Sequence, residues 1–229
     1  MLGLLTERGH NIVNSEEEAD AIVINTCCFI HDAKEESVET ILEMAEYKKA
    51  GSLKALIVTG CMAQRYKEEI IQEIPEVDAV LGTTSYGDIV KALDEVLKGK
   101  SFQEFRDINE LPAVSASRVL TTGGHFGYLK IAEGCDKHCT YCIIPSLRGR
   151  FRSIPEERLI QQAEYMASQG VKELILVAQE TTVYGTDIYG KKTLHLLLKK
   201  LCGIKGIRWI RVLYCYPEEI YDELIQVMK

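Results

Sequence analysis

The sequence lacks any apolar run approaching the ~20 residues of a membrane-spanning helix, so we expect neither a membrane span nor a membrane partner. It has no excess of basic charge, with 27 basic residues against 34 acidic ones, which argues against nonspecific binding to nucleic acid. It shows no secretory signal, so we expect its eight cysteines to be reduced thiols in a cytoplasmic protein. Hydrophobic residues make up 46% of the chain, as in ordinary globular proteins.

Three cysteines form a compact motif in the second half of the chain. Cys135, Cys139 and Cys142 follow a C-x-x-x-C-x-x-C pattern directly after a strand-like segment at 126–132. Cysteine thiolates are the usual ligands of iron–sulfur clusters, and three ligands leave one iron of a four-iron cluster open to a substrate or cofactor. This pattern therefore indicates an enzyme. The alternatives are a zinc site completed by His138, although structural zinc usually has two separated ligand pairs, and three buried structural cysteines.

Short apolar runs alternate with amphipathic helical patterns, which predicts an α/β fold with parallel sheets and helices packed against them. The expected strands are residues 21–25, 55–59, 77–81, 126–132, 173–178 and 207–214. The expected helices include one with Val38, Ile41, Leu42 and Ala45 on its buried face, one at 89–97, one at 155–170, one at 194–201 and one from Pro217.

The rhythm of strands and helices divides the chain into two expected domains. We predict an N-terminal domain over residues 1–99, a polar connector over 100–122 that contains Pro112, and a second domain over 123–229. The second domain has only three expected strands, which is part of a barrel or a small complete open sheet. Because the chain opens in a helical pattern and stops inside a helix, we expect a fragment truncated at both ends.

Several suggestive residues follow the C-terminal ends of expected strands, where ligands bind in parallel α/β folds. Cys27 and Cys61 follow neighbouring strands and would lie on one rim, either sharing a metal or packing as ordinary cysteines. Cys28 should point to the opposite face from Cys27. Glu180 follows the strand at 173–178 and would bind a cofactor ammonium group or form a surface salt bridge.

Other cysteines and basic residues have simpler expectations. We expect Cys202 and Cys215 to pack as small hydrophobic residues. Basic residues outnumber acidic ones between 130 and 152, and Arg148 and Arg150 in this stretch either clamp an anion or are solvated loop charges.

The motifs together resemble a known family. The triplet with Tyr141 before its last cysteine resembles the radical S-adenosylmethionine superfamily. The wider string Glu-Gly-Cys-Asp-Lys-His-Cys-Thr-Tyr-Cys-Ile-Ile-Pro-Ser-Leu-Arg-Gly-Arg, with Asn-Thr-Cys and Gly-Cys-Met-Ala-Gln-Arg upstream, resembles the methylthiotransferases. The strings Ala-Gln-Glu-Thr-Thr-Val-Tyr-Gly (178–185) and Leu-Tyr-Cys-Tyr-Pro-Glu-Glu (213–219) are most similar to the branch that modifies an aspartate of a small-subunit ribosomal protein.

The resemblance implies an N-terminal open parallel sheet with flanking helices, followed by the first part of a radical S-adenosylmethionine partial (β/α) barrel. It implies that Cys135, Cys139 and Cys142 hold a [4Fe-4S] cluster whose open iron binds S-adenosylmethionine. Reductive cleavage of that cofactor gives a radical that abstracts hydrogen from an unactivated carbon. Because this chemistry belongs to the cofactor, no acid–base catalytic residue is assigned.

The resemblance also assigns the remaining site residues. Cys27 and Cys61 match two of the three ligands of a second [4Fe-4S] cluster, which carries the sulfur to be inserted and is incompletely ligated in this chain. Tyr141 would lie near the adenine, and Glu180 would contact the amine of S-adenosylmethionine.

The expected activity is methylthio insertion at an aspartate of a small-subunit ribosomal protein, supported by an electron donor. The alternative within the family is a tRNA adenosine methylthiotransferase, the only case in which a nucleic acid partner is expected. A non-catalytic zinc-binding module is the alternative from another class. We expect the fragment alone to be inactive, because it lacks one cluster ligand and the rest of the barrel.

Overall fold

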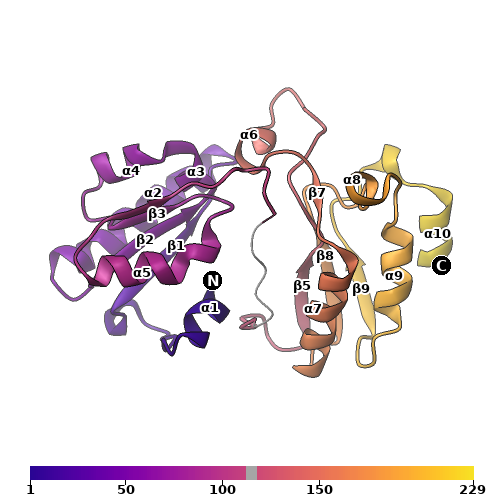
Figure 1. The fold of residues 1–229 in the computed structure, drawn as a ribbon, viewed down its shortest axis with the longest axis horizontal. Coiled ribbons are helices and arrows are strands. Elements are labelled where there is room, and N and C mark those ends of the chain that lie inside the picture. The colour runs from indigo at the N-terminus through magenta and orange to yellow at the C-terminus, as the bar shows by residue number, and fades with distance from the viewer. Residues whose placement is uncertain (112–117) are drawn as a thin grey trace. The chain divides into compact units, whose positions relative to one another are not determined.

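The computed structural model of the chain describes residues 1–111 and 118–229, and its elements are drawn in Figure 1. The chain divides into two compact units. The first contains the described residues up to Arg118 together with Tyr141–Arg148, and the second contains Val119–Thr140 and Gly149–Lys229. The segment at 141–148, which carries the last cysteine of the triplet, thus packs with the N-terminal part of the chain.

The first unit is built on a four-stranded parallel sheet in the order β1-β2-β3-β4. Its strands are β1 (Ala21–Thr26), β2 (Ala55–Gly60), β3 (Ala79–Leu81) and β4 (Phe102–Glu104). The three strands predicted in this region are confirmed, the third in shortened form. All six residues of β2 are buried, as expected for a central parallel strand covered on both faces.

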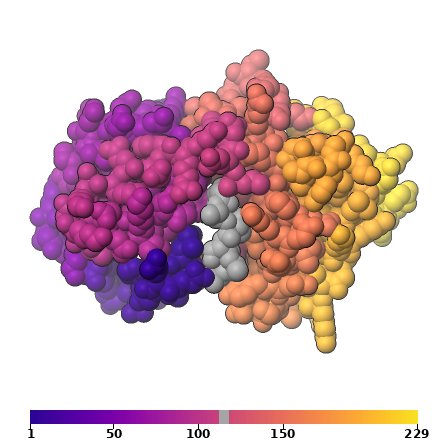
Figure 2. Space-filling model, viewed as in Figure 1, coloured from indigo at the N-terminus to yellow at the C-terminus, as the bar shows by residue number. Residues whose placement is uncertain are grey.

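Side chains of β2 alternate between two hydrophobic cores. Leu56 and Val58 pack in the core that includes helix α2 (His31–Lys49), while Ala55 and Ile57 pack in the core that includes helix α5 (Ile89–Leu97). Figure 1 shows α5 in front of the sheet, and Figure 2 shows magenta residues at the surface of the same face (Figure 1, Figure 2). The sheet of the first unit is therefore enclosed by helices on both sides.

Two predictions for this unit need correction. Leu42 was predicted on the buried face of α2, but it is 48% exposed, because the face toward the sheet is formed by Ile41, Met44 and Ala45. The connector predicted at 100–122 begins too early, because β4 lies within it and pairs with β3 in register from Ala79↔Phe102. Pro112 of that connector lies outside the described residues.

The remaining helices of the first unit are short. They are α1 (Leu2–Glu7), α3 (Cys61–Tyr66), α4 (Glu68–Glu73) and α6 (Ile144–Arg148). Helix α6 is held by the buried Leu147, which belongs to the core beneath α2, and by Thr83 Oγ1, which donates to the Leu147 carbonyl at 3.0 Å.

The second unit contains a three-stranded parallel sheet in the order β5-β8-β9. Its strands are β5 (Phe126–Lys130), β8 (Glu173–Val177) and β9 (Trp209–Val212). Helices α7 (Glu156–Ser168) and α9 (Leu194–Cys202) connect them, with α8 (Thr186–Tyr189) before α9 and α10 (Asp222–Met228) after β9. The strand–helix alternation predicted for this region is confirmed, and the unit has the parallel three-stranded sheet that the sequence indicated.

The strand predicted over 126–132 is divided in two. At Ile131 the chain changes partner: the Ile131 amide still donates to Val177 of β8 at 2.9 Å, while its carbonyl accepts from Ile154 at 2.8 Å. Strand β6 (Ala132–Glu133) then pairs antiparallel with β7 (Arg152–Ser153). The cysteine loop between Glu133 and Arg152 is thus closed at its base by a two-stranded ribbon.

Cys202 was predicted to be a core residue, and this is wrong because it is exposed at the end of α9. The buried face of α9 is formed by Leu194, Leu197, Leu198 and Leu201. Cys202 follows Leu201 by one residue, about 100° further around the helix, and so lies off this stripe. Among the described helices, none has the length and apolar character needed to cross a membrane.

Candidate functional site

The cysteine loop is anchored by backbone contacts at its base. Gly134 has a φ of 77°, and a Cβ there would lie 2.1 Å from the Arg150 carbonyl oxygen. The amide of Cys135 donates to Gly149 at 3.2 Å, and Asp136 Oδ1 accepts from the amide of Phe151 at 3.1 Å. Glycine at 134 lets the two sides of the loop approach closely and sets where Cys135 leaves the ribbon.

Cys135, Cys139 and Cys142 are half-buried cysteines. Cys135 and Cys139 belong to the second unit, whereas Cys142 lies in the segment that packs with the first. In the described part of the chain, no three Cys, His, Asp or Glu side chains are gathered as a ready metal-binding group. The donor set of three thiols suits an iron–sulfur cluster.

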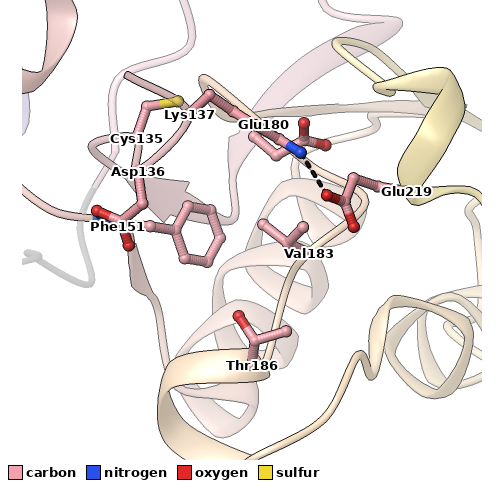
Figure 3. Close-up of a pocket in the computed structure, with 8 residues that line it drawn as sticks. All are labelled: Cys135, Asp136, Lys137, Phe151, Glu180, Val183, Thr186 and Glu219. Atoms are coloured by element: carbon pink, nitrogen blue, oxygen red, sulfur yellow. Dashed lines mark hydrogen bonds and ion pairs between the residues drawn. The ribbon is translucent and has the colours of Figure 1, made fainter. Parts of the chain in front are cut away.

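Beside Cys135 lies a pocket of about 230 Å³ in the second unit. Its lining includes Cys135, Lys137, Phe151, Glu180 and Glu219, which Figure 3 shows as sticks (Figure 3). Small-molecule sites usually measure about 300–1,000 Å³, so this one has room for an amino-acid-sized group. The pocket places acidic and basic side chains next to the first cysteine of the triplet.

Glu180 is buried in this pocket, with 2% of its surface exposed. Its Oε1 accepts hydrogen bonds from the amide of Thr182 at 3.0 Å and from the Thr182 hydroxyl. Its Oε2 is buried and has no hydrogen-bond partner among the described residues. The surface salt bridge considered for Glu180 is therefore wrong, and the unpartnered oxygen fits a donor or cation supplied by a ligand.

Glu219 lies between two lysines in the same unit. Its carboxylate pairs with Lys137 and, at 2.8 Å, with Lys192. Hydrogen bonds first from Lys137 and then from Lys192 lower the pKa of Glu219 to about 2. The same hydrogen bond raises the pKa of Lys137, so both partners stay charged near neutral pH.

The rim of the first sheet brings the N-terminal cysteines to neighbouring positions. Strands β1 and β2 pair in register from Ala21↔Ala55 to Thr26↔Gly60, so Cys27 and Cys61 follow paired strand ends as predicted. Cys28 is buried in the core while Cys27 is exposed, which confirms that they point in different directions. Burial, followed by the charge of Cys61, raises the pKa of Cys28.

The structure places two predicted site residues of the segment at 141–148, Arg148 and Tyr141. Arg148 Nε donates a hydrogen bond to Cys61 Sγ at 3.2 Å, so Arg148 is not a solvated loop charge. Tyr141 is 86% exposed and is not among the residues described as lining the pocket. Its place near an adenine stays a prediction.

Sequence reasoning missed the roles of Lys137 and Glu219. In the sequence, Lys137 is one of several basic residues between 130 and 152, and Glu219 ends the string at 213–219. The available signal was the opposite charge of these two residues within two family motifs.

Two family models match the chain. Residues 1–82 match a model described as "Uncharacterized protein family UPF0004", and residues 129–229 match the "Radical SAM superfamily". Curated relatives named "Ribosomal protein uS12 methylthiotransferase RimO" are 66% identical over 229 residues in Lachnoclostridium phytofermentans and 51% identical over 229 residues in Clostridioides difficile. Both alignments cover 100% of this chain and 52% of the relative, so the chain spans about half their length.

Solved structures support the same fold. A radical S-adenosylmethionine methyltransferase, TsrM, from Kitasatospora setae, with tryptophan substrate and a SAM analogue bound, matches with a TM-score of 0.57. A second TsrM structure, with cobalamin and a [4Fe-4S] cluster bound, gives the same TM-score. The chain is 12% identical to each, and the alignments cover 91% of this chain and 45% or 47% of the other. At that identity the likeness shows an α/β radical S-adenosylmethionine fold and no more.

Proposed function

Because the chain belongs to the radical S-adenosylmethionine methylthiotransferase family, we propose that it carries the radical-generating site of a ribosomal protein methylthiotransferase. The observation that carries the proposal is the buried Glu180 Oε2 in the pocket beside Cys135, which has no hydrogen-bond partner in the part of the chain that the structure describes. A site for S-adenosylmethionine needs thiolates for iron and an acceptor for the amino group of the cofactor, and the pocket borders on both.

The proposed roles follow from the chemistry of the side chains. Cys135, Cys139 and Cys142 would hold a [4Fe-4S] cluster, which when bound would pass an electron from an external donor to S-adenosylmethionine for cleavage of a carbon–sulfur bond. Glu180 accepts a hydrogen bond from the ammonium group of the cofactor through Oε2 and is itself oriented by Thr182. Tyr141 supplies an aromatic surface for the adenine.

For the first unit, we propose that Cys27 and Cys61 are ligands of a second [4Fe-4S] cluster that carries sulfur. Support comes from the paired ends of β1 and β2, which place both cysteines at one rim of the sheet. Arg148 reaches the same rim through its hydrogen bond to Cys61 and would lie beside such a cluster. Arginine there offers a positive charge and a donor to a sulfur ligand, two features that tune iron–sulfur sites.

The proposed substrate of the longer protein is ribosomal protein uS12, modified at an aspartate, with an electron donor as a second partner. The names of the relatives support this substrate over a tRNA adenosine. A cytoplasmic location is part of the same proposal, since this is where ribosomes meet their modifying enzymes.

Two experiments test the proposal. The longer protein that contains this sequence is reconstituted anaerobically with iron and sulfide, given a reductant and S-adenosylmethionine, and assayed for 5′-deoxyadenosine. We expect product from the longer protein and none from its Cys135→Ala variant, whereas stoichiometric zinc without iron would contradict the radical chemistry. In cells that lack the gene, mass spectrometry should show uS12 without its methylthio group, and an unchanged modification would remove uS12 as the substrate.

A further inference from the structure

Two glutamates line the pocket and differ in what they contact. Glu180 keeps Oε2 buried with no hydrogen-bond partner among the described residues, whereas Glu219 is held by two lysine ammonium groups. Lys137 donates a hydrogen bond to Glu219 and lines the same pocket as Glu180, so it lies near both carboxylates. Figure 3 shows the Lys137 ammonium directed to Glu219 (Figure 3).

A lysine ammonium group with no other acceptor would be strongly attracted to the Glu180 carboxylate. The side chain has a flexible four-carbon stem, and a charge-assisted hydrogen bond to a carboxylate is about twice as strong as a neutral one. A buried acceptor without a partner adds to this attraction, since pairing it removes a desolvation cost. Lys137 is therefore a potential internal competitor for any cationic group that enters the pocket.

Several contacts keep Lys137 directed to Glu219 instead. The Lys137 ammonium lies 4.6 Å from the centroid of the Tyr216 ring, which favours a cation over its face. Glu219 is fixed in turn by Lys192, whose Nζ contacts both the Glu219 carboxylate and the Glu219 carbonyl at 2.8 Å. The acceptor that holds Lys137 through Oε1 is thus itself held through its other oxygen, Oε2.

We propose that Glu219 is a positioning residue that draws Lys137 away from Glu180 and so keeps the Glu180 carboxylate open for the ammonium group of S-adenosylmethionine. This inference rests on the proposed function of the pocket. It adds a specificity element to that function. Lys137 is kept from pairing with Glu180, so a ligand cation can bind Glu180 Oε2. Glu219 and Lys137 act on ligand binding through Glu180.

A purely structural role for the Lys137–Glu219 pair makes a different prediction. If the pair only ties the cysteine loop to the turn at 217–219, removing either partner weakens the site equally and removing both gives no recovery. If Lys137 competes for Glu180, only the loss of Glu219 is harmful, and removing Lys137 as well restores binding. A double-variant comparison separates the two roles.

The experiment measures the dissociation constant of S-adenosylmethionine by equilibrium dialysis with the anaerobically reconstituted chain. The variants are Glu219→Gln, Lys137→Gln, the two combined, and the exposed neighbour Glu218→Gln as a matched control. We expect Glu219→Gln to raise the dissociation constant roughly tenfold, the size expected when a charged hydrogen bond is blocked. Lys137→Gln, the combined variant and the control should stay within about twofold of the parent, equivalent to a small surface effect.

A second ligand sharpens the test. 5′-Methylthioadenosine lacks the amino acid portion, so its binding should be the same in the parent and in Glu219→Gln. Equal weakening by Lys137→Gln and Glu219→Gln, or no recovery in the combined variant, would overturn the inference while leaving the proposed function in place. Failure of the reconstituted parent to bind S-adenosylmethionine would overturn the proposed function, and the inference with it.

Discussion

Arg148 Nε donates a hydrogen bond to Cys61 Sγ at 3.2 Å. The two residues are separated by 87 positions, and Arg148 ends the short helix that follows the cysteine triplet. The preceding residue, Leu147, is 4% exposed and packs in the core of the first unit. The segment after Cys142 is therefore part of the hydrophobic core that supports the rim carrying Cys27 and Cys61.

This packing predicts that Leu147→Ala loosens α6. Removing a buried leucine side chain costs about 2–5 kcal/mol of stability, because contacts are lost and a cavity remains. Hydrogen exchange of the amides at 144–148 should become faster. Leu42→Ala, at an exposed position of the same unit, should cost less than about 1 kcal/mol in chemical denaturation. Unchanged exchange at 144–148 in Leu147→Ala would show that the segment is held by other contacts.

Gly134 offers a test of the base of the cysteine loop. Gly134 and Gly124 have nearly equal positive φ values, 77° and 79°, so alanine pays a similar conformational cost at both, about 1–2 kcal/mol. Only at Gly134 would the added Cβ meet the Arg150 carbonyl oxygen at 2.1 Å, since nothing lies within 4 Å at Gly124. Thermal unfolding should show a clearly larger loss for Gly134→Ala, and equal losses would mean that the loop base relaxes freely.

Much of the fold could be predicted because its signals are local. The apolar runs of β1, β2 and β8 are short, bounded and followed by helical periodicity, so the sheets and the strand ends that carry Cys27 and Cys61 followed directly. Strand β4 was missed because Phe102–Glu104 has three residues and only one large apolar side chain. Pairing with β3, which sequence periodicity does not contain, makes this segment a strand.

The candidate site was predictable only in part. The cysteines and Glu180 belong to recognisable patterns, but the pairing of Lys137 with Glu219 joins residues 82 positions apart. No local rule links them, because the contact depends on how the turn at 217–219 returns to the cysteine loop. Likewise, the exposure of Cys202 follows from the stripe of leucines that α9 turns toward the sheet.

The depressed pKa of Glu219 predicts a specific acid sensitivity. Its pKa is about 2 in the folded chain against an ordinary value of 4.5, so the folded state binds its proton less readily than the unfolded state. The resulting stability is present above about pH 4.5 and is lost as the pH falls toward 2. Melting temperatures of the parent and of Glu219→Gln, measured from pH 6 downward in roughly half-unit steps, should converge in acid. A constant difference would show that Glu219 does not contribute through its charge.

The cysteines of the triplet should differ sharply from Cys202 in their effect on iron binding. Each of Cys135→Ala, Cys139→Ala and Cys142→Ala removes a proposed cluster ligand, and a [4Fe-4S] cluster with two protein thiolates is poorly held. After anaerobic reconstitution, iron and acid-labile sulfide in all three variants should fall to the amount that the proposed site at Cys27 and Cys61 retains. Cys202→Ala is the matched control, because it removes an exposed thiol on α9 and should keep the parent's iron content. Parent-level iron in any one of the three triplet variants would remove that cysteine from the ligand set.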